Sequence, residues 1–295
     1  MFSDEAKIFA VPVNGGPPSV LSRPVGEHHH GDGSSAGAGH EHDEEIQVDN
    51  PIWSPDGTRI AFTRTPCEYC PPELYLMNKD GAAQRRLSRL RNTYQPTWSP
   101  NGRRLGVLLP GRRSGLYSVD PEAGVSRRIL TDRAAIEAPS WSRTRDEIVY
   151  ARQVTATNWD IYATDPAGRS RRRLTRSRSQ ETTPEWSPDG RRIALTRQRA
   201  NGNWAIYTMR GDGTQIRPVT DGGQNAVEPT WSPEGDRIAF TLQPRHDRST
   251  IAIVDARGGA VRAITDASLF ATQPAWSPDG RTIAFAARAV THITN

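Results

Sequence analysis

The sequence predicts an all-β fold, a six-bladed β-propeller with four antiparallel strands in each blade. Three observations predict it: six tryptophans recur at intervals of 45, 43, 45, 45 and 45 residues, each follows a proline by two positions, and five of the six precede a tight-turn sequence. Four-stranded units that repeat every 40 to 50 residues are typical of propeller blades. The repeat tryptophans are Trp53, Trp98, Trp141, Trp186, Trp231 and Trp276.

Each unit contains signals for four strands in a fixed order. The pattern P-x-W-S-P-D-G-x-R-I-A-F, as at 51–62 and 184–195, places proline and glycine where a tight turn joins the first strand to the second. R-I-A-F alternates in the manner of a half-buried strand. About 21 residues after each of the first five tryptophans an I-Y pair or its equivalent marks the third strand, and a run ending in L-T or its equivalent marks the fourth. In the third copy, 142–145 departs from the S-P-D-G turn without a change in length.

The ends of the chain complete the count of strands. Six first-and-second strand pairs are present, but only five third-and-fourth pairs follow them. The missing pair is at the N-terminus, in 8–11 and 20–22, and the last inner pair is at 276–287. We expect these segments to share one blade, which leaves no open sheet edge and makes 1–295 a single propeller domain.

Composition excludes several classes of protein. The chain is 35% apolar and 24% charged with a net charge of +5, and it contains two cysteines, so it is neither disordered nor a disulfide-rich scaffold. No apolar stretch is long enough for a membrane span. Arginine pairs are spread around the repeats without an aromatic platform, so nucleic acid is not an expected partner. No signal peptide is visible at 1–10, which favours the cytoplasm for the chain as written, and we expect a monomer.

The P-x-W-S-P-D-G-x-x-I-A-F unit resembles the repeat of TolB-type six-bladed propellers and, more distantly, the propeller of prolyl-oligopeptidase-like enzymes. The resemblance covers nearly the whole chain. It implies the propeller fold and a periplasmic or exported location if the native N-terminus is missing. The N-terminal α/β domain of the Tol-system protein and the hydrolase domain of the peptidases are absent from this sequence.

The loops that lead into the first strands are the predicted binding site. Loops from every blade of a propeller converge at a mouth of the central channel, and acidic side chains here would attract a cationic segment of a protein or peptide. The candidates lie within three residues before each repeat proline: Asp49, Asn50, Tyr94, Gln95, Glu137, Glu181, Glu228 and Gln273.

A second candidate site lies in an insertion before the first repeat. Residues 26–45 form a Gly-, acid- and His-rich segment that we expect to be a flexible loop. Imidazole, carboxylate and thiolate ligands suit zinc, copper or nickel. The candidate ligands are His28, His29, His30, His40, His42, Cys67 and Cys70. Because Pro71 and Pro72 forbid a continuing helix, a free thiol pair or a local disulfide is favoured over a redox motif.

These observations favour a non-catalytic module that binds a protein or peptide through its channel-face loops. The G-x-S-x-G match at 33–37 lies in a glycine-rich segment without the strand and helix that such a nucleophile needs. No other nucleophile–base constellation is visible, so a protein without catalytic activity is favoured over an enzyme. The alternatives are a metal-dependent lyase or hydrolase at the channel mouth, and a metal-responsive protein that uses the His-rich loop.

Overall fold

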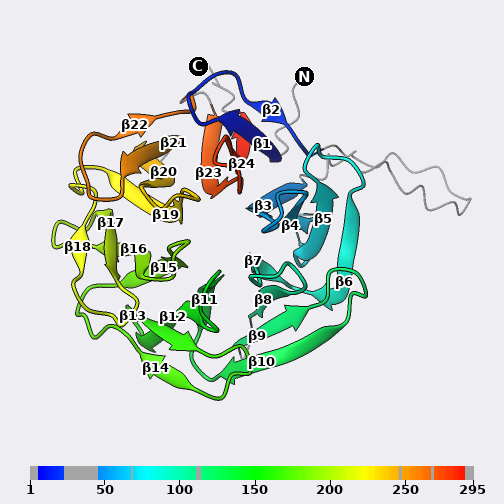
Figure 1. The fold of residues 1–295 in the computed structure, drawn as a ribbon, viewed down its shortest axis with the longest axis horizontal. Coiled ribbons are helices and arrows are strands. Elements are labelled where there is room, and N and C mark those ends of the chain that lie inside the picture. The colour runs from blue at the N-terminus through cyan, green and yellow to red at the C-terminus, as the bar shows by residue number, and fades with distance from the viewer. Residues whose placement is uncertain are drawn as a thin grey trace, which may run out of the picture.

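The computed structural model describes residues 6–22, 46–67, 69–110, 114–245, 248–266 and 269–289. Within these residues, 24 strands form six antiparallel sheets of four strands each, arranged in a ring around a central axis (Figure 1). The predicted all-β, six-bladed propeller is therefore confirmed. The inserted segment 26–45 lies outside the described residues.

We number the blades after their innermost strands. Blade 1 consists of β3 (Gln47–Trp53), β4 (Arg59–Thr65), β5 (Glu73–Asn78) and β6 (Arg85–Arg91). Blade 2 consists of β7 (Tyr94–Trp98), β8 (Leu105–Leu109), β9 (Ser114–Val119) and β10 (Ser126–Asp132). Blade 3 consists of β11 (Ile136–Trp141), β12 (Ile148–Thr155), β13 (Asn158–Thr164) and β14 (Arg171–Arg173). Blade 4 consists of β15 (Glu181–Trp186), β16 (Arg192–Gln198), β17 (Trp204–Arg210) and β18 (Arg217–Pro218). Blade 5 consists of β19 (Asn225–Trp231), β20 (Arg237–Arg245), β21 (Arg248–Asp255) and β22 (Arg262–Ala263).

Blade 6 joins the two ends of the chain. It contains β23 (Leu269–Trp276) and β24 (Thr282–Ala289) from the C-terminal side, and β1 (Lys7–Pro12) and β2 (Ser19–Val20) from the N-terminal side. Strand β1 pairs with β24 over six positions, from Lys7 opposite Ala287 to Pro12 opposite Thr282. Figure 1 shows β1 beside β24, with the ring continuous through this blade. The predicted closure is confirmed.

The hydrophobic core consists of clusters that bridge neighbouring blades. One cluster brings Leu74 and Leu76 of blade 1 together with Trp98 and Leu105 of blade 2. The six repeat tryptophans are each at most 9% exposed, and each belongs to a different cluster of this kind. They therefore act as packing elements between blades, where a large aromatic surface contributes much of the burial free energy.

Many of the repeat arginines are explained by the same packing. The guanidinium of Arg59 in blade 1 lies 5.4 Å from the ring centroid of Trp98 in blade 2. Arg192 lies 4.6 Å from Trp231, and Arg237 lies 5.2 Å from Trp276. Such cation–π contacts cover the edges of these inter-blade cores.

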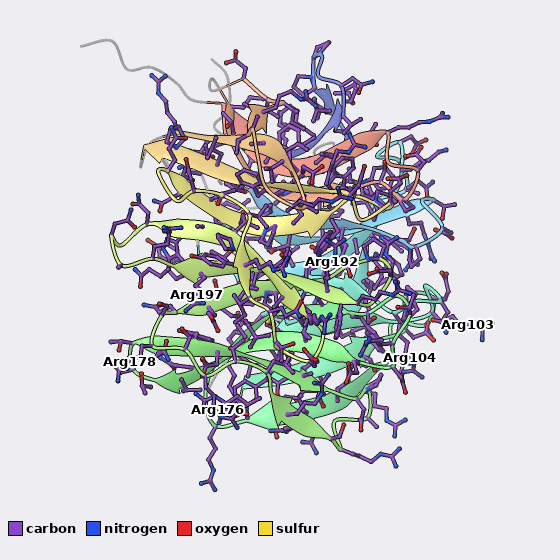
Figure 2. The ribbon with its side chains drawn as sticks, turned by 60° about the vertical axis from the view of Figure 1, so that its left-hand side comes forward. Arg103, Arg104, Arg176, Arg178, Arg192 and Arg197 are labelled. Carbon is purple, nitrogen blue, oxygen red and sulfur yellow. A yellow bond between two sulfur atoms is a disulfide. The ribbon has the colours of Figure 1, made fainter. Side chains whose placement is uncertain are left out.

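The antiparallel meander gives the ring two distinct faces. Innermost strands begin at the face that we call the mouth face and end at the W-S-P turns of the opposite face, the turn face. Figure 2 shows the separation: Arg176, Arg178 and Arg197 lie on one side of the ring, and Arg103, Arg104 and Arg192 lie towards the other. Arg192 and Arg197 are near opposite ends of the same strand, β16.

Candidate functional site

Each innermost strand contains a β-bulge at its repeat proline. In blade 1 the register shifts between Asp49 and Ile52, and each of the other five blades has a shift at the matching place. Proline cannot donate a hydrogen bond to a sheet ladder, so it is tolerated inside a central strand only where the ladder is interrupted. The prolines of the repeat thus mark six bulges arranged around the channel.

The residue before each of these prolines has a left-handed backbone conformation. The six residues and their φ angles are Asn50 (54°), Gln95 (49°), Ala138 (49°), Thr183 (45°), Glu228 (57°) and Gln273 (56°). None is glycine, and a β-branched residue such as Thr183 is a genuine outlier in this region. Strain of this kind persists only where the surrounding structure holds it, and it concentrates at binding sites and active sites.

Hydrogen bonds hold these residues together across blade boundaries. Gln273 Oε1 accepts from the backbone N–H of Asn50 at 2.7 Å, and Gln95 Oε1 accepts from that of Ala138 at 2.7 Å. Glu228 Oε2 accepts from the backbone N–H of Gln273 at 2.9 Å. Side chains of one blade therefore fix the strained backbone of the next, which preorganises the channel mouth.

The ring surrounds a central cavity of about 210 Å³. All six blades contribute to its wall, through the bulge prolines, the residues that flank them and the edges of the repeat tryptophans. Water molecules or a side chain of a ligand can occupy a cavity of this size. The six residues with left-handed backbone line its mouth-face end. Their side chains are the amides of Asn50, Gln95 and Gln273, the methyl of Ala138, the hydroxyl of Thr183 and the carboxyl of Glu228.

Glu228 places a carboxyl group at the mouth of the cavity. Its carboxylate accepts hydrogen bonds from Thr241 Oγ1 at 2.7 Å and from the backbone of Gln273. Burial raises the pKa of Glu228, the hydrogen bonds oppose that rise, and the nearby charge of Asp49 adds to it. A cation that entered the cavity would stabilise the charged carboxylate.

A second carboxyl, Glu185, lies deeper in the cavity wall. It accepts hydrogen bonds from the backbone of Trp231 and from Thr230 Oγ1, both at 3.2 Å. Burial raises its pKa to about 7, against the effect of these bonds and of the Arg143 charge. Arg143 lines the same cavity near its turn-face end. The cavity is thus acidic at the mouth and carries a cation at its far end.

Comparison with known proteins places the fold in a family. The family model described as TolB beta propeller domain matches residues 72–292, about three quarters of the chain. The chain belongs to this family. A protein TolB homolog from Chlorobium luteolum is 35% identical over 97 residues, and the Tol-Pal system protein TolB from Anaeromyxobacter dehalogenans is 29% identical over 93. Each alignment covers 31% of this chain and 21% of the relative, so it spans about a fifth of the length of these TolB proteins.

Solved structures agree on the architecture. A protein described as TolB from Agrobacterium tumefaciens superposes with a TM-score of 0.76 at 19% identity, covering 97% of this chain and 99% of the other. An oligogalacturonate lyase in complex with manganese superposes with a TM-score of 0.57 at 12% identity, with both chains covered completely. At these identities the likeness shows the fold alone, and propellers of this shape serve several functions.

Within this TolB-type propeller, half of the predicted binding residues line the cavity. Asn50, Gln95, Glu228 and Gln273 all directly precede a bulge proline and lie in the cavity wall. The other four occupy different positions of the strand, whose successive side chains point in different directions.

Asp49, Tyr94 and Glu137 are one residue further from the proline and do not line the cavity. Asp49 lines a separate pocket of about 160 Å³, and Tyr94 is 38% exposed. Burial raises the pKa of both Asp49 and Glu137. These three residues sit beside the predicted site and not in its wall.

Glu181 is the clearest departure from the expected arrangement. It is three residues before its proline, a position occupied in other blades by buried residues such as Val48 and Ala226, and it is 0% exposed. Its carboxylate lies 3.5 Å from Arg197 Nε, and burial raises its pKa. Glu181 is therefore a buried carboxyl that pairs with the half-buried Arg197 between strands β15 and β16.

Glu185 and Arg143 were not among the residues predicted from the sequence, although the repeat contains a signal for both. The residue between proline and tryptophan is Ile52, Thr97, Ser140, Thr230 or Ala275 in the other blades, and a carboxylic acid only in blade 4. Arg143 occupies the place of the turn proline in the degenerate third copy. Residues that depart from the repeat at positions facing the channel would therefore have identified both.

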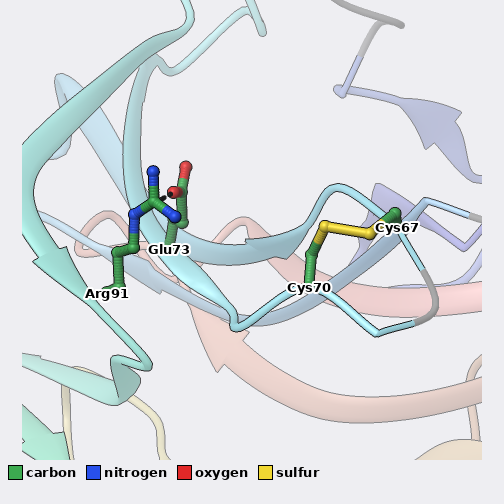
Figure 3. The surroundings of a disulfide bond; sticks show 4 residues. All are labelled: Cys67, Cys70, Glu73 and Arg91. Carbon is green, nitrogen blue, oxygen red and sulfur yellow. Dashed lines mark ion pairs between the residues drawn. A yellow bond between two sulfur atoms is a disulfide. The ribbon is translucent and has the colours of Figure 1, made fainter.

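The residues predicted to bind a metal are not brought together in the described structure. Cys67 and Cys70 form a disulfide in the loop between β4 and β5 (Figure 3), so their sulfurs are not thiolate ligands in this state. The same figure shows Glu73 close by, paired with Arg91 at 4.0 Å. His28, His29, His30, His40 and His42 lie outside the described residues. The described part of the chain has no group of three or more His, Cys, Asp or Glu that could hold a metal, and it contains no helix long and apolar enough to cross a membrane.

Proposed function

We propose that this chain is a non-catalytic TolB-like binding module, and that its cavity takes a cationic side chain from a segment of a partner protein or peptide. The observation that carries the proposal is the ring of six strained, hydrogen-bonded residues around the mouth of the cavity. Such a ring is rigid before any ligand arrives, which lowers the entropic cost of binding.

The charges along the cavity support a cationic ligand that enters from the mouth face. Glu228 is at the mouth, Glu185 is deeper in the wall, and Arg143 is at the turn-face end. A lysine or arginine side chain from the partner would meet Glu228 first and would stop short of Arg143. Asn50 Oδ1 and Gln95 Nε2, the amide atoms not used in bonds to Thr63 and Ala138, would bond the backbone of the same segment.

A displayed library of random peptides tests this proposal. We expect peptides that bind the full chain to contain lysine or arginine, and Glu228→Gln to weaken the selected peptides at least 10-fold, because it removes the charge and keeps the hydrogen-bonding shape. Glu234→Gln is the matched control: the same change in the same blade, at an exposed residue of the turn face. Selected peptides without basic residues, or equal losses in both variants, would contradict the proposal.

The disulfide supports a location outside the reducing cytosol. Disulfides persist in oxidising compartments and are rare in cytosolic proteins. The periplasmic or exported location implied by the family is therefore the one we propose. The partner would then be another exported protein or a membrane protein facing the same compartment.

Thiol alkylation checks the redox state of the cysteines. For protein isolated from its native host and unfolded in the presence of iodoacetamide, we expect no modification of Cys67 or Cys70 without reductant. After reduction we expect two carbamidomethyl groups per chain, read by mass spectrometry. Full modification without reductant would mean a dithiol in the cell and would favour the cytoplasm.

A further inference from the structure

A groove of about 940 Å³ on the turn face spans blades 3, 4 and 5 and is rich in arginine. Figure 2 shows Arg192 of this groove towards the side of the ring opposite to Arg176 and Arg178. Two aspartates, Asp189 and Asp212, also line it. The arginines are Arg145, Arg172, Arg191, Arg192, Arg210, Arg217 and Arg257.

Three of the seven arginines have structural roles. Arg145 and Arg192 lie over the rings of Trp186 and Trp231, at 5.3 and 4.6 Å from their centroids. Arg172 Nη2 donates to both oxygens of Glu147, at 2.8 and 3.0 Å. These arginines would be needed in the groove even if nothing bound there.

The other four arginines have no such role. The side chains of Arg191, Arg210, Arg217 and Arg257 are exposed, and they form no hydrogen bond or ion pair with the described residues. The two aspartates offset part of the charge of Arg191 and Arg210, but each is hydrogen-bonded inside its own turn and neither interacts with Arg217 or Arg257. Asp189 Oδ1 accepts from Ser187 Oγ and the backbone of Arg191, and Asp212 Oδ1 accepts from the backbone and hydroxyl of Thr214.

The matching place between blades 1 and 2 shows what such arginines bind when an acid is available. There, Arg59 and Arg85 both pair with Glu122, a residue of the turn after β9. Strand registers make Arg192 the counterpart of Arg59, and Arg217 the counterpart of Arg85. In blade 5 the corresponding turn, after β21, supplies Arg257 in place of an acid.

We propose that this groove binds an acidic segment of a partner protein, with an Asp or Glu carboxylate of the partner taking the place that Glu122 fills between blades 1 and 2. Arginine forms bidentate bonds with carboxylates, and clustered arginines attract an acidic chain over several ångströms. Arg145 and Arg192 already cover the faces of Trp186 and Trp231, so these rings offer no stacking surface for nucleic-acid bases. This surface is on the face opposite to the cavity mouth and does not depend on the function proposed there.

The experiment measures fluorescence anisotropy of a labelled decaglutamate peptide with the full chain at low ionic strength. We expect saturable binding to the wild type and none to decaglutamine. Arg257→Glu restores an internal acid, so we expect it to weaken decaglutamate binding at least 10-fold, and Arg217→Gln with Arg257→Gln to weaken it similarly. The double variant Arg176→Gln with Arg178→Gln, on the mouth face, keeps the net charge equal to that of the second variant and should stay within twofold of the wild type.

Two results would overturn the proposal. Equal losses in the turn-face and mouth-face double variants would mean that the peptide follows net charge and not this groove. Unlabelled decaglutamate, inorganic polyphosphate and a ten-residue oligothymidylate would each be tested as competitors. If either phosphate polymer displaced the labelled peptide at a lower concentration of charge than unlabelled decaglutamate does, the groove would prefer phosphate polymers. Because all four substituted arginines are exposed, thermal unfolding of each variant should match the wild type within a few degrees.

Discussion

Gly168→Ala is expected to lower the free energy of unfolding by about 3 kcal/mol or more, whereas Gly202→Ala is expected to lower it by about 1 kcal/mol. Both glycines have left-handed backbone, with φ of 71° and 86°, and both close a turn with a hydrogen bond of about the same length. The strain that a Cβ adds to the backbone is therefore similar at the two positions. What differs is the space around them.

A Cβ at Gly168 would lie 2.1 Å from the carbonyl oxygen of Ile129 in the preceding blade, while a Cβ at Gly202 would meet nothing within 4 Å. The first contact is between two backbones, so no side-chain rotation can relieve it, and the blades must separate. The third-to-fourth-strand turns of blades 1 and 4 make the same contact, through Gly81 with Leu21 and Gly213 with Leu174. The glycine in this turn therefore sets how closely consecutive blades approach.

Urea denaturation followed by tryptophan fluorescence measures the difference between the two variants. Where unfolding is irreversible, the apparent Tm at one fixed scan rate replaces the midpoint. Equal destabilisation of the two variants would show that backbone strain alone matters and that blade spacing tolerates the extra carbon. A larger loss for Gly202→Ala would contradict the packing argument altogether.

The fold was predictable because the repeat marks where each blade and each strand begins. Tryptophan spacing gives the number of blades, turn residues separate the strands, and the unpaired segments at the two ends require a shared blade. The bulges were not predicted, although the proline before each tryptophan indicates them: a proline inside a central strand needs an interrupted ladder. Recognising this would have selected the residue directly before each proline as the one facing the cavity.

The candidate site was harder to predict because position along a strand decides which way a side chain points. Glu181 and Glu228 both precede a proline by no more than three residues, yet one is buried and pairs with Arg197, and the other lines the cavity. The prediction took any residue up to three positions before a proline, and these positions include both buried and cavity-facing side chains. Arg143 and Glu185 belong to the site through the three-dimensional arrangement of different blades, and only the comparison of matching repeat positions could have indicated them.

Glu185 should make the stability of the protein depend on pH near neutrality. Its pKa is raised from 4.5 to about 7 in the folded state. Between these two values the folded chain retains a proton that the unfolded chain has lost, so the free energy of unfolding falls as the pH rises through this window. Glu185→Gln does not titrate, and its amide oxygen can still accept from the Trp231 backbone and from Thr230.

We therefore expect Glu185→Gln to match the wild type at pH 5 and to exceed it by about 2 to 3 kcal/mol at pH 8. Denaturant titrations at pH 5, 6, 7 and 8 measure the difference, and Glu234→Gln, which removes an exposed carboxylate, should stay within about 0.5 kcal/mol of the wild type throughout. A difference between Glu185→Gln and the wild type that stays constant with pH would show that Glu185 does not titrate in this range.

A carboxyl that lowers stability at neutral pH in the free protein suits a site whose ligand carries a positive charge. A cationic side chain in the cavity would favour the charged form of Glu185 and would lower its pKa, because an opposite charge at close range stabilises the carboxylate. Glu185→Gln should thus be more stable and should bind a cationic peptide more weakly, with the loss of affinity largest at pH 8 and small at pH 5. If the variant gained stability and kept full affinity at pH 8, the carboxyl would have no part in binding, and Glu228 alone would account for the charge of the mouth.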